Sequence, residues 1–368
     1  MSSAQIEIQL IGLVVAAACA LPGVFLVLRG MAMMSDAISH TVLLGIVLGF
    51  MALGDLESPW LIIAAAGMGL ITVSLTELLN RTKLVKQDAA IGLVFPALFS
   101  LAVILISRFA RGVHLDTDAV LLGELAFAPF NRVELLGLSV PHSLALMAVV
   151  LLINIAFIAL FYKELKLATF DAGLAMALGF SPALIHYSLM ALVSVTAVGA
   201  FDAVGSILVV AFMVVPGAAA YLLTDKLERM LLYAVLIGAA GTIGGYWAAR
   251  WLDANIAGSM ATMIGLLFVL CLLLAPQRGL VAIAARRRRQ RWQFAQTMLT
   301  IHLLHHEGTP EARVENRLDH LHDHLRWEAQ FAQQVVQRAR EGGLIRLAND
   351  HLELTAQGRQ MAEQNLRA

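Results

Sequence analysis

The sequence predicts an all-α polytopic membrane protein with about eight to nine transmembrane helices, followed by a small winged-helix domain. Of its 368 residues, 59% are hydrophobic and only 14% are charged, and the mean hydropathy is +0.78. A soluble domain is usually about 25% charged. Charge is also distributed unevenly, because 23 of the 52 Lys, Arg, Asp and Glu residues lie from Arg286 onward. We therefore expect a bilayer-embedded body joined to a polar tail.

A helix that spans the bilayer needs about 20 mostly apolar residues. The segment 112–142 is harder to place, because His114, Asp116, Asp118 and Glu124 interrupt it. It is expected to form a re-entrant or interfacial helix, which leaves a range of eight to ten spans. Nine stretches are long and apolar enough to cross the bilayer, at roughly 6–28, 31–53, 59–79, 89–107, 143–161, 183–200, 204–223, 229–251 and 259–276.

Basic residues in the short loops indicate the orientation, because cytoplasmic loops carry an excess of Lys and Arg. Nine spans place the N-terminus outside, and they place the basic connections and the tail in the cytoplasm. Arg108 and Arg111 disagree, since they fall on the outer side. We expect a multi-pass protein of the cell membrane, whether that is an inner or a plasma membrane. The basic connections are 81–86, 163–166, 226–229 and 286–291.

Toward the C-terminus the sequence changes from continuously apolar to amphipathic. This change predicts three parts: a transmembrane domain at 1–280, a basic linker at 281–291 and a cytoplasmic domain at 292–368. Within the last part, Asn349 and Asp350 form a turn signal between two strand-like runs. Helices followed by a small hairpin make a winged-helix arrangement. The expected elements are helices at 292–306, 311–325 and 327–341, strands at 344–348 and 351–354, and a last helix from residue 356.

Two polar side chains stand out inside the second apolar stretch. Asp36 and His40 are four residues apart, so both leave one face of a helix within about 6 Å of each other. Ionisable residues inside a span are costly and are functional candidates by default. A carboxylate and an imidazole suit manganese, iron or zinc, although the two side chains could also pair with each other or hold a neighbouring helix. Two ligands are too few for a stable site, and a second subunit at a shared axis would supply two more.

Several short motifs carry a family resemblance. Residues 31–40 read MAMMSDAISH, residues 87–92 read QDAAIG, residues 203–205 read AVG and residues 215–220 read VPGAAA. In this order, over roughly residues 10–277, they resemble the zinc/manganese/iron ABC permeases, in which a helix carries an Asp-x-x-x-His pair. The resemblance implies that Asp36 and His40 line the translocation pathway and bind the transported ion, with no permanently bound cofactor.

The same resemblance implies a set of partners. The stretch 162–182 resembles the coupling helix that docks into a cleft of an ATPase, whereas its spacing alone fits an ordinary surface helix. The sequence contains no G-x-x-x-x-G-K-[ST] motif, so the nucleotide-binding subunit is expected to be another chain and this chain is not an enzyme. A second permease copy or a related permease, and an extracytoplasmic metal-binding protein, complete the expected assembly.

The tail resembles the winged-helix domains of iron- and manganese-dependent repressors, through RAREGGLI at 338–345 and LELTAQGR at 352–359. From Arg286 on, however, 13 Arg face 10 Asp plus Glu, which is a weak electrostatic footprint for nucleic acid. We expect a regulatory or assembly role, with nucleic acid not a partner. The run 286–289 is expected to contact anionic lipid headgroups.

Histidines are concentrated in the tail. His302 shares a helix face with His305 or His306, and His320 shares one with His324, with His322 between them. Such pairs could bind a regulatory metal, and they also fit solvated or cap-satisfied histidines.

Two other functions remain open at this level. The chain could be a membrane-anchored metal-responsive regulator that acts through its winged helix. It could also be a permease for chelated metal or a vitamin cofactor, although a large chelate needs a wide pathway without direct ligands such as Asp36 and His40. One carboxylate and one imidazole per subunit do not separate manganese, zinc and iron.

Overall fold

The fold is described from a computed structural model, and the chain divides into two compact units at Met1–Gly279 and Leu280–Ala368. The residues that the structure describes are 2–54, 58, 60–109, 123, 125–135, 137–310, 312–317, 321, 325–348 and 351–366.

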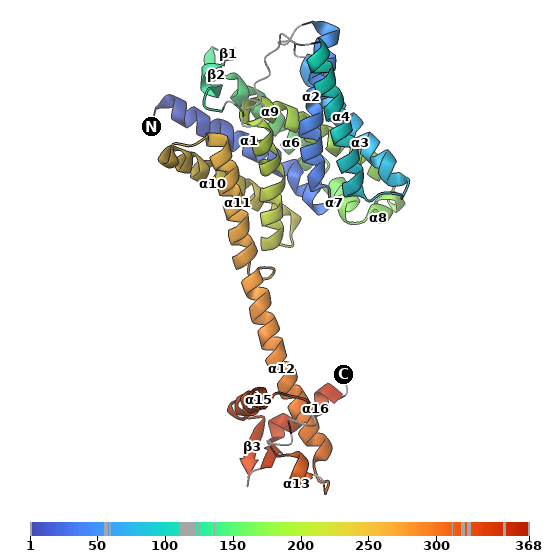
Figure 1. Ribbon diagram of the computed structural model, residues 1–368, viewed down its shortest axis with the longest axis vertical. Helices are drawn as coiled ribbons and strands as arrows, with labels where there is room; N and C mark the ends of the chain where they lie inside the picture. The colour runs from blue at the N-terminus through green and yellow to red at the C-terminus, as the bar shows by residue number, and fades with distance from the viewer. Residues whose placement is uncertain are drawn as a thin grey trace. The chain divides into compact units, whose positions relative to one another are not determined.

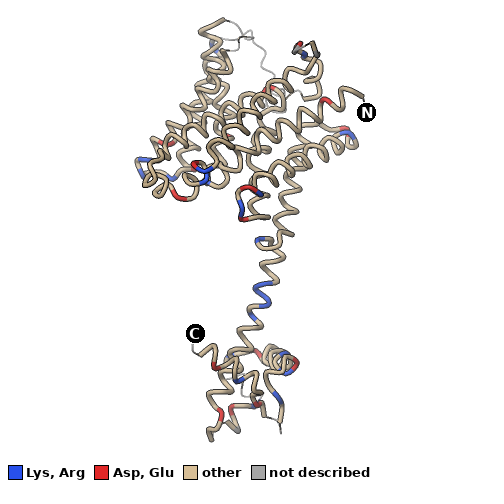
Figure 2. Tube along the Cα trace, turned by 180° about the vertical axis from the view of Figure 1, so that it is seen from behind, with Lys and Arg blue, Asp and Glu red and all other residues tan. Residues whose placement is uncertain are grey.

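The first unit is a bundle of helices in which α1 and α9 lie at the centre, α2 to α4 on one side and α10 and α11 on the other (Figure 1). Within the described residues, eight helices are long and apolar enough to cross a membrane. Charged residues gather near the helix ends and in the loops (Figure 2). The spanning helices are α1 (Ser3–Leu28), α2 (Ala32–Leu53), α3 (Trp60–Arg81), α4 (Gln87–Phe109), α6 (His142–Leu160), α9 (Pro182–Leu223), α10 (Leu227–Leu252) and α11 (Ile256–Leu274).

Local sequence signals set where these helices begin and end. A capping box at Ser2 and Gln5 starts α1, because each side chain accepts a hydrogen bond from the other residue's backbone. The side chain of Asn255 accepts the Gly258 N–H at the start of α11. Gly54 ends α2 in the left-handed conformation, which glycine adopts without strain. The short loops that result keep consecutive helices adjacent.

The 42-residue helix α9 consists of two segments that meet at Gly205 (φ 74°, ψ 165°). His186 Nδ1 lies 3.4 Å from Arg29 Nη1, just beyond α1, and Gly217 packs against Val24, near the same end of α1. His186 and Gly217 would be about 46 Å apart along a straight helix. The two segments must therefore run antiparallel, and α9 supplies both of the spans expected at 183–200 and 204–223.

Close backbone approaches and one buried amide hold the centre together. A Cβ on Gly23 would lie 1.9 Å from the Met213 carbonyl oxygen, so only glycine permits this contact between α1 and α9. Asn154 of α6 is fully buried and donates to the Ala18 carbonyl oxygen at 2.8 Å and to Thr196 Oγ1 at 3.0 Å. The amide thus ties α1, α6 and α9 together where no water can replace it.

In the segment 112–142, the described residues are 123, 125–135 and 137–142, and they include neither His114, Asp116, Asp118 nor Glu124. Its described part is a 3₁₀ turn (η1, Ala128–Phe130) and an antiparallel hairpin of β1 (Arg132–Leu135) and β2 (Leu138–Pro141), with Arg132 paired to Pro141. The re-entrant or interfacial helix expected here is therefore wrong for 132–135 and 138–141, which form strands. Strands replace it because Val and Leu alternate with polar residues in this stretch.

The second unit contains α12 (Leu280–His306), α13 (Ala312–Glu315), α15 (Ala329–Glu341) and α16 (Ala356–Leu366), and an antiparallel hairpin of β3 (Ile345–Ala348) and β4 (His351–Leu354). Its core includes Leu299, Leu303, Val335 and Leu352. The segment 281–291 expected as a linker is the start of α12, since its Ala, Arg and Gln residues favour helix. Of the helix expected at 311–325, the structure describes 312–317, 321 and 325, and α13 ends at Glu315. Asn349 and Asp350 lie outside the described residues.

The turn inside α9 gives a stability prediction. The backbone angles of Gly205 are accessible to almost no other residue, so Gly205→Ala should destabilise the chain by about 1–3 kcal/mol. Gly265→Ala is the matched control, because a Cβ there meets nothing within 4 Å and alanine favours helix. Thermal unfolding of both variants in detergent checks this, and equal midpoints would contradict the role given to Gly205.

Candidate functional site

Asp36 and His40 lie one turn apart on α2, as the sequence predicts. His40 Nε2 is 3.5 Å from Asp36 Oδ1, and the two side chains are 31% and 34% exposed, respectively. The pair thus sits on a partly open face of a spanning helix rather than in the packed core. Its lone pairs are accessible to an ion that approaches that face.

The opposite face of α2 is fixed by close packing, which determines where the pair points. Thr72 of α3 donates to Thr41 Oγ1 at 2.8 Å, and both hydroxyl groups are buried. A Cβ on Gly45 would lie 2.7 Å from Ala65 Cα, so α2 and α3 meet at backbone distance there. Because one face of α2 is held in this way, Asp36 and His40 are kept on the other.

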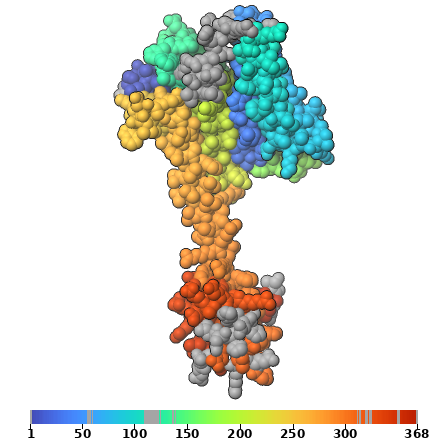
Figure 3. Space-filling view, viewed as in Figure 1, coloured from blue at the N-terminus to red at the C-terminus, as the bar shows by residue number. Residues whose placement is uncertain are grey.

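Aromatic rings of α4 orient the imidazole. The His40 ring stacks on Phe95, with centroids 5.7 Å apart, and meets the edge of Phe99 at 5.8 Å. The helix α4 runs along the surface of the first unit (Figure 3), with few of its side chains buried. Apolar rings therefore pack against one side of the pair.

The pair offers one oxygen and one nitrogen ligand to a cation. Within the described part of the chain, no third His, Cys, Asp or Glu joins Asp36 and His40 in a cluster of metal-ligand size. A structural metal site takes four ligands. One copy of this chain thus offers two of the four ligands that such a site takes.

A second polar cluster, which the sequence analysis missed, lies where α1 ends and α9 begins. Glu77 Oε2 accepts from Tyr187 Oη at 2.5 Å, Glu77 Oε1 accepts from Arg81 Nη2 at 2.7 Å, and His186 Nε2 is 4.0 Å from Glu77 Oε2. Arg29 donates from Nε to Thr169 Oγ1 at 3.1 Å. The cluster therefore links the end of α1, α3 and α9 to the short helix α7 (Tyr162–Phe170), which contains Thr169.

Arg29 keeps its positive charge in this cluster. Burial lowers the pKa of Arg29 to about 10, so the guanidinium stays protonated at neutral pH. Each of these ionisable residues ends or begins an apolar stretch, a signal that the sequence does contain. What the sequence could not reveal is that residues so distant along the chain meet.

The stretch 162–182 forms two short helices, α7 (Tyr162–Phe170) and α8 (Ala172–Ala177). Asp171 separates them and accepts the Leu174 N–H at 2.8 Å, which starts α8. Several large apolar side chains are exposed here: Phe170 at 61%, Leu174 at 47%, Met176 at 62%, Leu178 at 60% and Phe180 at 39%. We call these five residues the apolar loop patch. Next to it is a cavity of about 670 Å³ lined by Arg29, Glu77 and His186.

The first unit is a bundle of spanning helices. One of these helices carries an ionisable pair, and an exposed apolar loop lies outside the spans. This is the architecture of a membrane permease. The chain belongs to the ABC 3 transport family, which matches residues 5–275. That match covers almost the whole first unit.

Named relatives agree with this membership. The chain is 48% identical over 360 residues to the zinc transport system membrane protein TroD of Treponema pallidum, which covers 98% of each protein. It is 47% identical over 271 residues to the manganese transport system membrane protein MntD of Bacillus subtilis, covering 73% of this chain and 92% of that one. The match to TroD therefore extends through most of the second unit.

A solved structure supports the fold. The structure of PsaBC from Streptococcus pneumoniae in complex with Fab superposes with a TM-score of 0.64 at 28% identity, covering 76% of this chain and 94% of that chain.

The Glu77 cluster gives a prediction about coupling between side chains. Tyr187→Phe should cost about 0.5–1.5 kcal/mol of stability, because one hydrogen bond is lost. In a chain that already carries Glu77→Ala, Tyr187→Phe should lower the stability by less, because the carboxylate that accepts the hydrogen bond is already absent. A double-mutant cycle on unfolding in detergent measures this, with the exposed Glu134→Ala as the control that should add independently. Strict additivity of Glu77→Ala and Tyr187→Phe would contradict the contact.

Proposed function

We propose that this chain is the membrane permease subunit of an ABC importer for divalent transition-metal ions, with Asp36 and His40 as the ligands of the transported ion. The observation that carries the site assignment is a carboxylate and an imidazole 3.5 Å apart on the partly open face of a spanning helix. Family membership and metal-transporting relatives support the same conclusion. Manganese, zinc and iron all suit this ligand pair.

A second permease, either another copy or a related chain, completes the site. An ionised carboxylate facing lipid is costly, and such groups almost always face a bundle interior or an aqueous cavity. Pairing around a two-fold axis would bury the open face of α2 and provide two Asp and two His ligands. A site assembled between subunits also opens when they move apart, which suits release of a transported ion.

ATP hydrolysis by a separate subunit would drive alternating access. The apolar loop patch is the proposed docking surface for this ATPase, because five large apolar side chains are exposed on two short helices and the turn that follows them. The Arg29 to Thr169 hydrogen bond joins the same loop to the end of α1. Movement of the loop would therefore reach the spanning helices through a defined contact.

The basic loops suggest how the chain is oriented in the membrane. With the N-terminus outside, both ends of α9 and the second unit face the cytoplasm, and an extracytoplasmic metal-binding protein delivers the ion to the outer end. The basic start of α12, Arg286–Arg289, would contact anionic headgroups of the cell membrane.

The second unit is proposed to be a winged-helix domain with a regulatory or assembly role. This rests on helices followed by an antiparallel hairpin. Nucleic acid is not among the proposed partners, since acidic and basic residues nearly balance in this unit.

Removal of either ligand tests the transport site. Asp36→Asn and His40→Gln should each reduce uptake of Mn²⁺ or Zn²⁺ by the reconstituted transporter by about 10- to 100-fold, because the ion loses a direct ligand. Asp253→Asn removes an exposed carboxylate and suits the left-handed backbone at that position, so it should transport normally. Wild-type uptake of every ion by Asp36→Asn and His40→Gln would overturn the site assignment.

The docking surface has its own test. Leu174→Asp combined with Met176→Asp places two charges in the apolar loop patch and should weaken binding of the ATPase subunit by about tenfold or more. Lys86→Ala, an exposed change in the connection between α3 and α4 and outside the stretch 162–182, is the control and should have little effect. Co-purification with the ATPase and ATPase-binding titrations provide the measurement. Undiminished binding of the double variant would exclude this loop as the docking site.

A further inference from the structure

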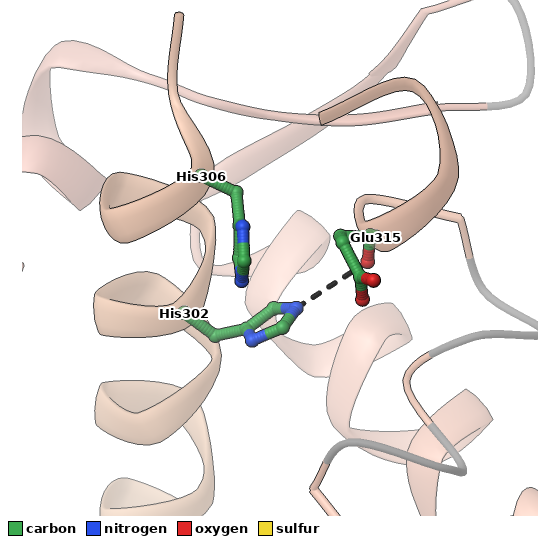
Figure 4. A group of neighbouring side chains, drawn as sticks. All are labelled: His302, His306 and Glu315. Atoms are coloured by element: carbon green, nitrogen blue, oxygen red, sulfur yellow. Dashed lines mark hydrogen bonds between the residues drawn. The ribbon is translucent and has the colours of Figure 1, made fainter. Parts of the chain in front are cut away.

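A cluster of metal-ligand side chains lies in the second unit, far along the sequence from Asp36 and His40. It consists of His302 and His306 on the last turns of α12 and Glu315 at the end of α13. Figure 4 shows the two imidazoles and the carboxylate turned toward a common space between the two helices. One ligand atom from each residue lies within 4.8 Å of the others.

The backbone around the cluster is fixed from three sides. Thr309 Oγ1 donates to the His306 carbonyl oxygen at 2.8 Å, which closes the turn after α12. The Leu352 N–H of β4 donates to the Asn316 carbonyl oxygen at 2.9 Å, so the hairpin holds the end of α13 in place. His302 Nε2 lies 3.3 Å from the Glu315 carbonyl oxygen (Figure 4). The three side chains are thus presented by a preformed frame.

We propose that His302, His306 and Glu315 bind one divalent transition-metal ion of the zinc class. In a tetrahedral zinc site, ligand atoms are about 3.4 Å apart, and small side-chain rotations bring atoms within 4.8 Å to that spacing. Two imidazoles favour zinc-like ions over magnesium or calcium. The residues are half-buried, so the ion can reach them from solvent.

The ligand set indicates an exchangeable site rather than a permanent structural one. Three protein ligands leave a coordination position for water, whereas structural zinc sites are closed by four. An ion bound here would clamp α13 to α12 in addition to the existing hydrogen bonds. The sequence pairs His302 with either His305 or His306. The fold selects His306 and adds Glu315, which lies on a different helix. His320, His322 and His324 lie outside the described residues.

Metal-binding titrations on the full-length chain in lipid nanodiscs test the proposal. All proteins carry Asp36→Ala and His40→Ala, so the result does not depend on the proposed transport site. The background protein should bind one equivalent of Zn²⁺ per chain. His302→Gln combined with His306→Gln, and separately the isosteric Glu315→Gln, should weaken that binding by at least about tenfold.

The matched control is Glu328→Gln, because Glu328 is exposed in the same unit and lies outside the cluster. It should keep the full equivalent. Co²⁺ provides a second readout, since its visible absorption should report nitrogen ligands in the background protein and change in His306→Gln. A background protein that binds no Zn²⁺, or a double histidine variant that binds it as tightly as the background protein does, would overturn the proposal.

Discussion

The organisation of the first unit depends on one constraint: an ionisable side chain inside a bilayer needs a partner. Asp36 and His40 meet each other at 3.5 Å, yet about a third of each side chain stays exposed in a single copy. The contacts of α2 with α3 keep that face from turning into the core. A lone chain would leave a carboxylate exposed to lipid. On the proposed function, pairing with a second permease would resolve this conflict, and the same pairing would create a site with enough ligands for an ion.

The antiparallel segments of α9 connect the proposed docking surface to α1. The first segment begins beside the Arg29 and Glu77 cluster, whose hydrogen bonds include Thr169 of the loop. Gly205 reverses the chain, and the second segment returns along α1 at backbone distance from Gly23. Rigid packing of this kind transmits displacement rather than absorbing it. On the proposed mechanism, motion of the loop therefore shifts α1 and α9 together.

Much of this was predictable because hydrophobic length alone identifies spanning helices, and an i, i+4 pair needs only helical geometry to meet. The hairpin at 132–141 and the helical character of 281–291 were not predicted, since short polar segments follow tertiary context and local propensity rather than apolar length. The Glu77 cluster and Glu315 were missed for a different reason. Their partners come from distant positions, and spacing along one helix reveals no contact between elements.

The central claim is that two permeases share one ion between their Asp36 and His40 side chains. Anomalous X-ray scattering from Mn²⁺ in crystals of the complete transporter tests it most directly. The account predicts a peak between the two α2 helices, within coordination distance of Asp36 and His40 from one permease and of the matching residues from its partner. A peak coordinated by residues of one permease alone, or one located away from α2, would contradict it.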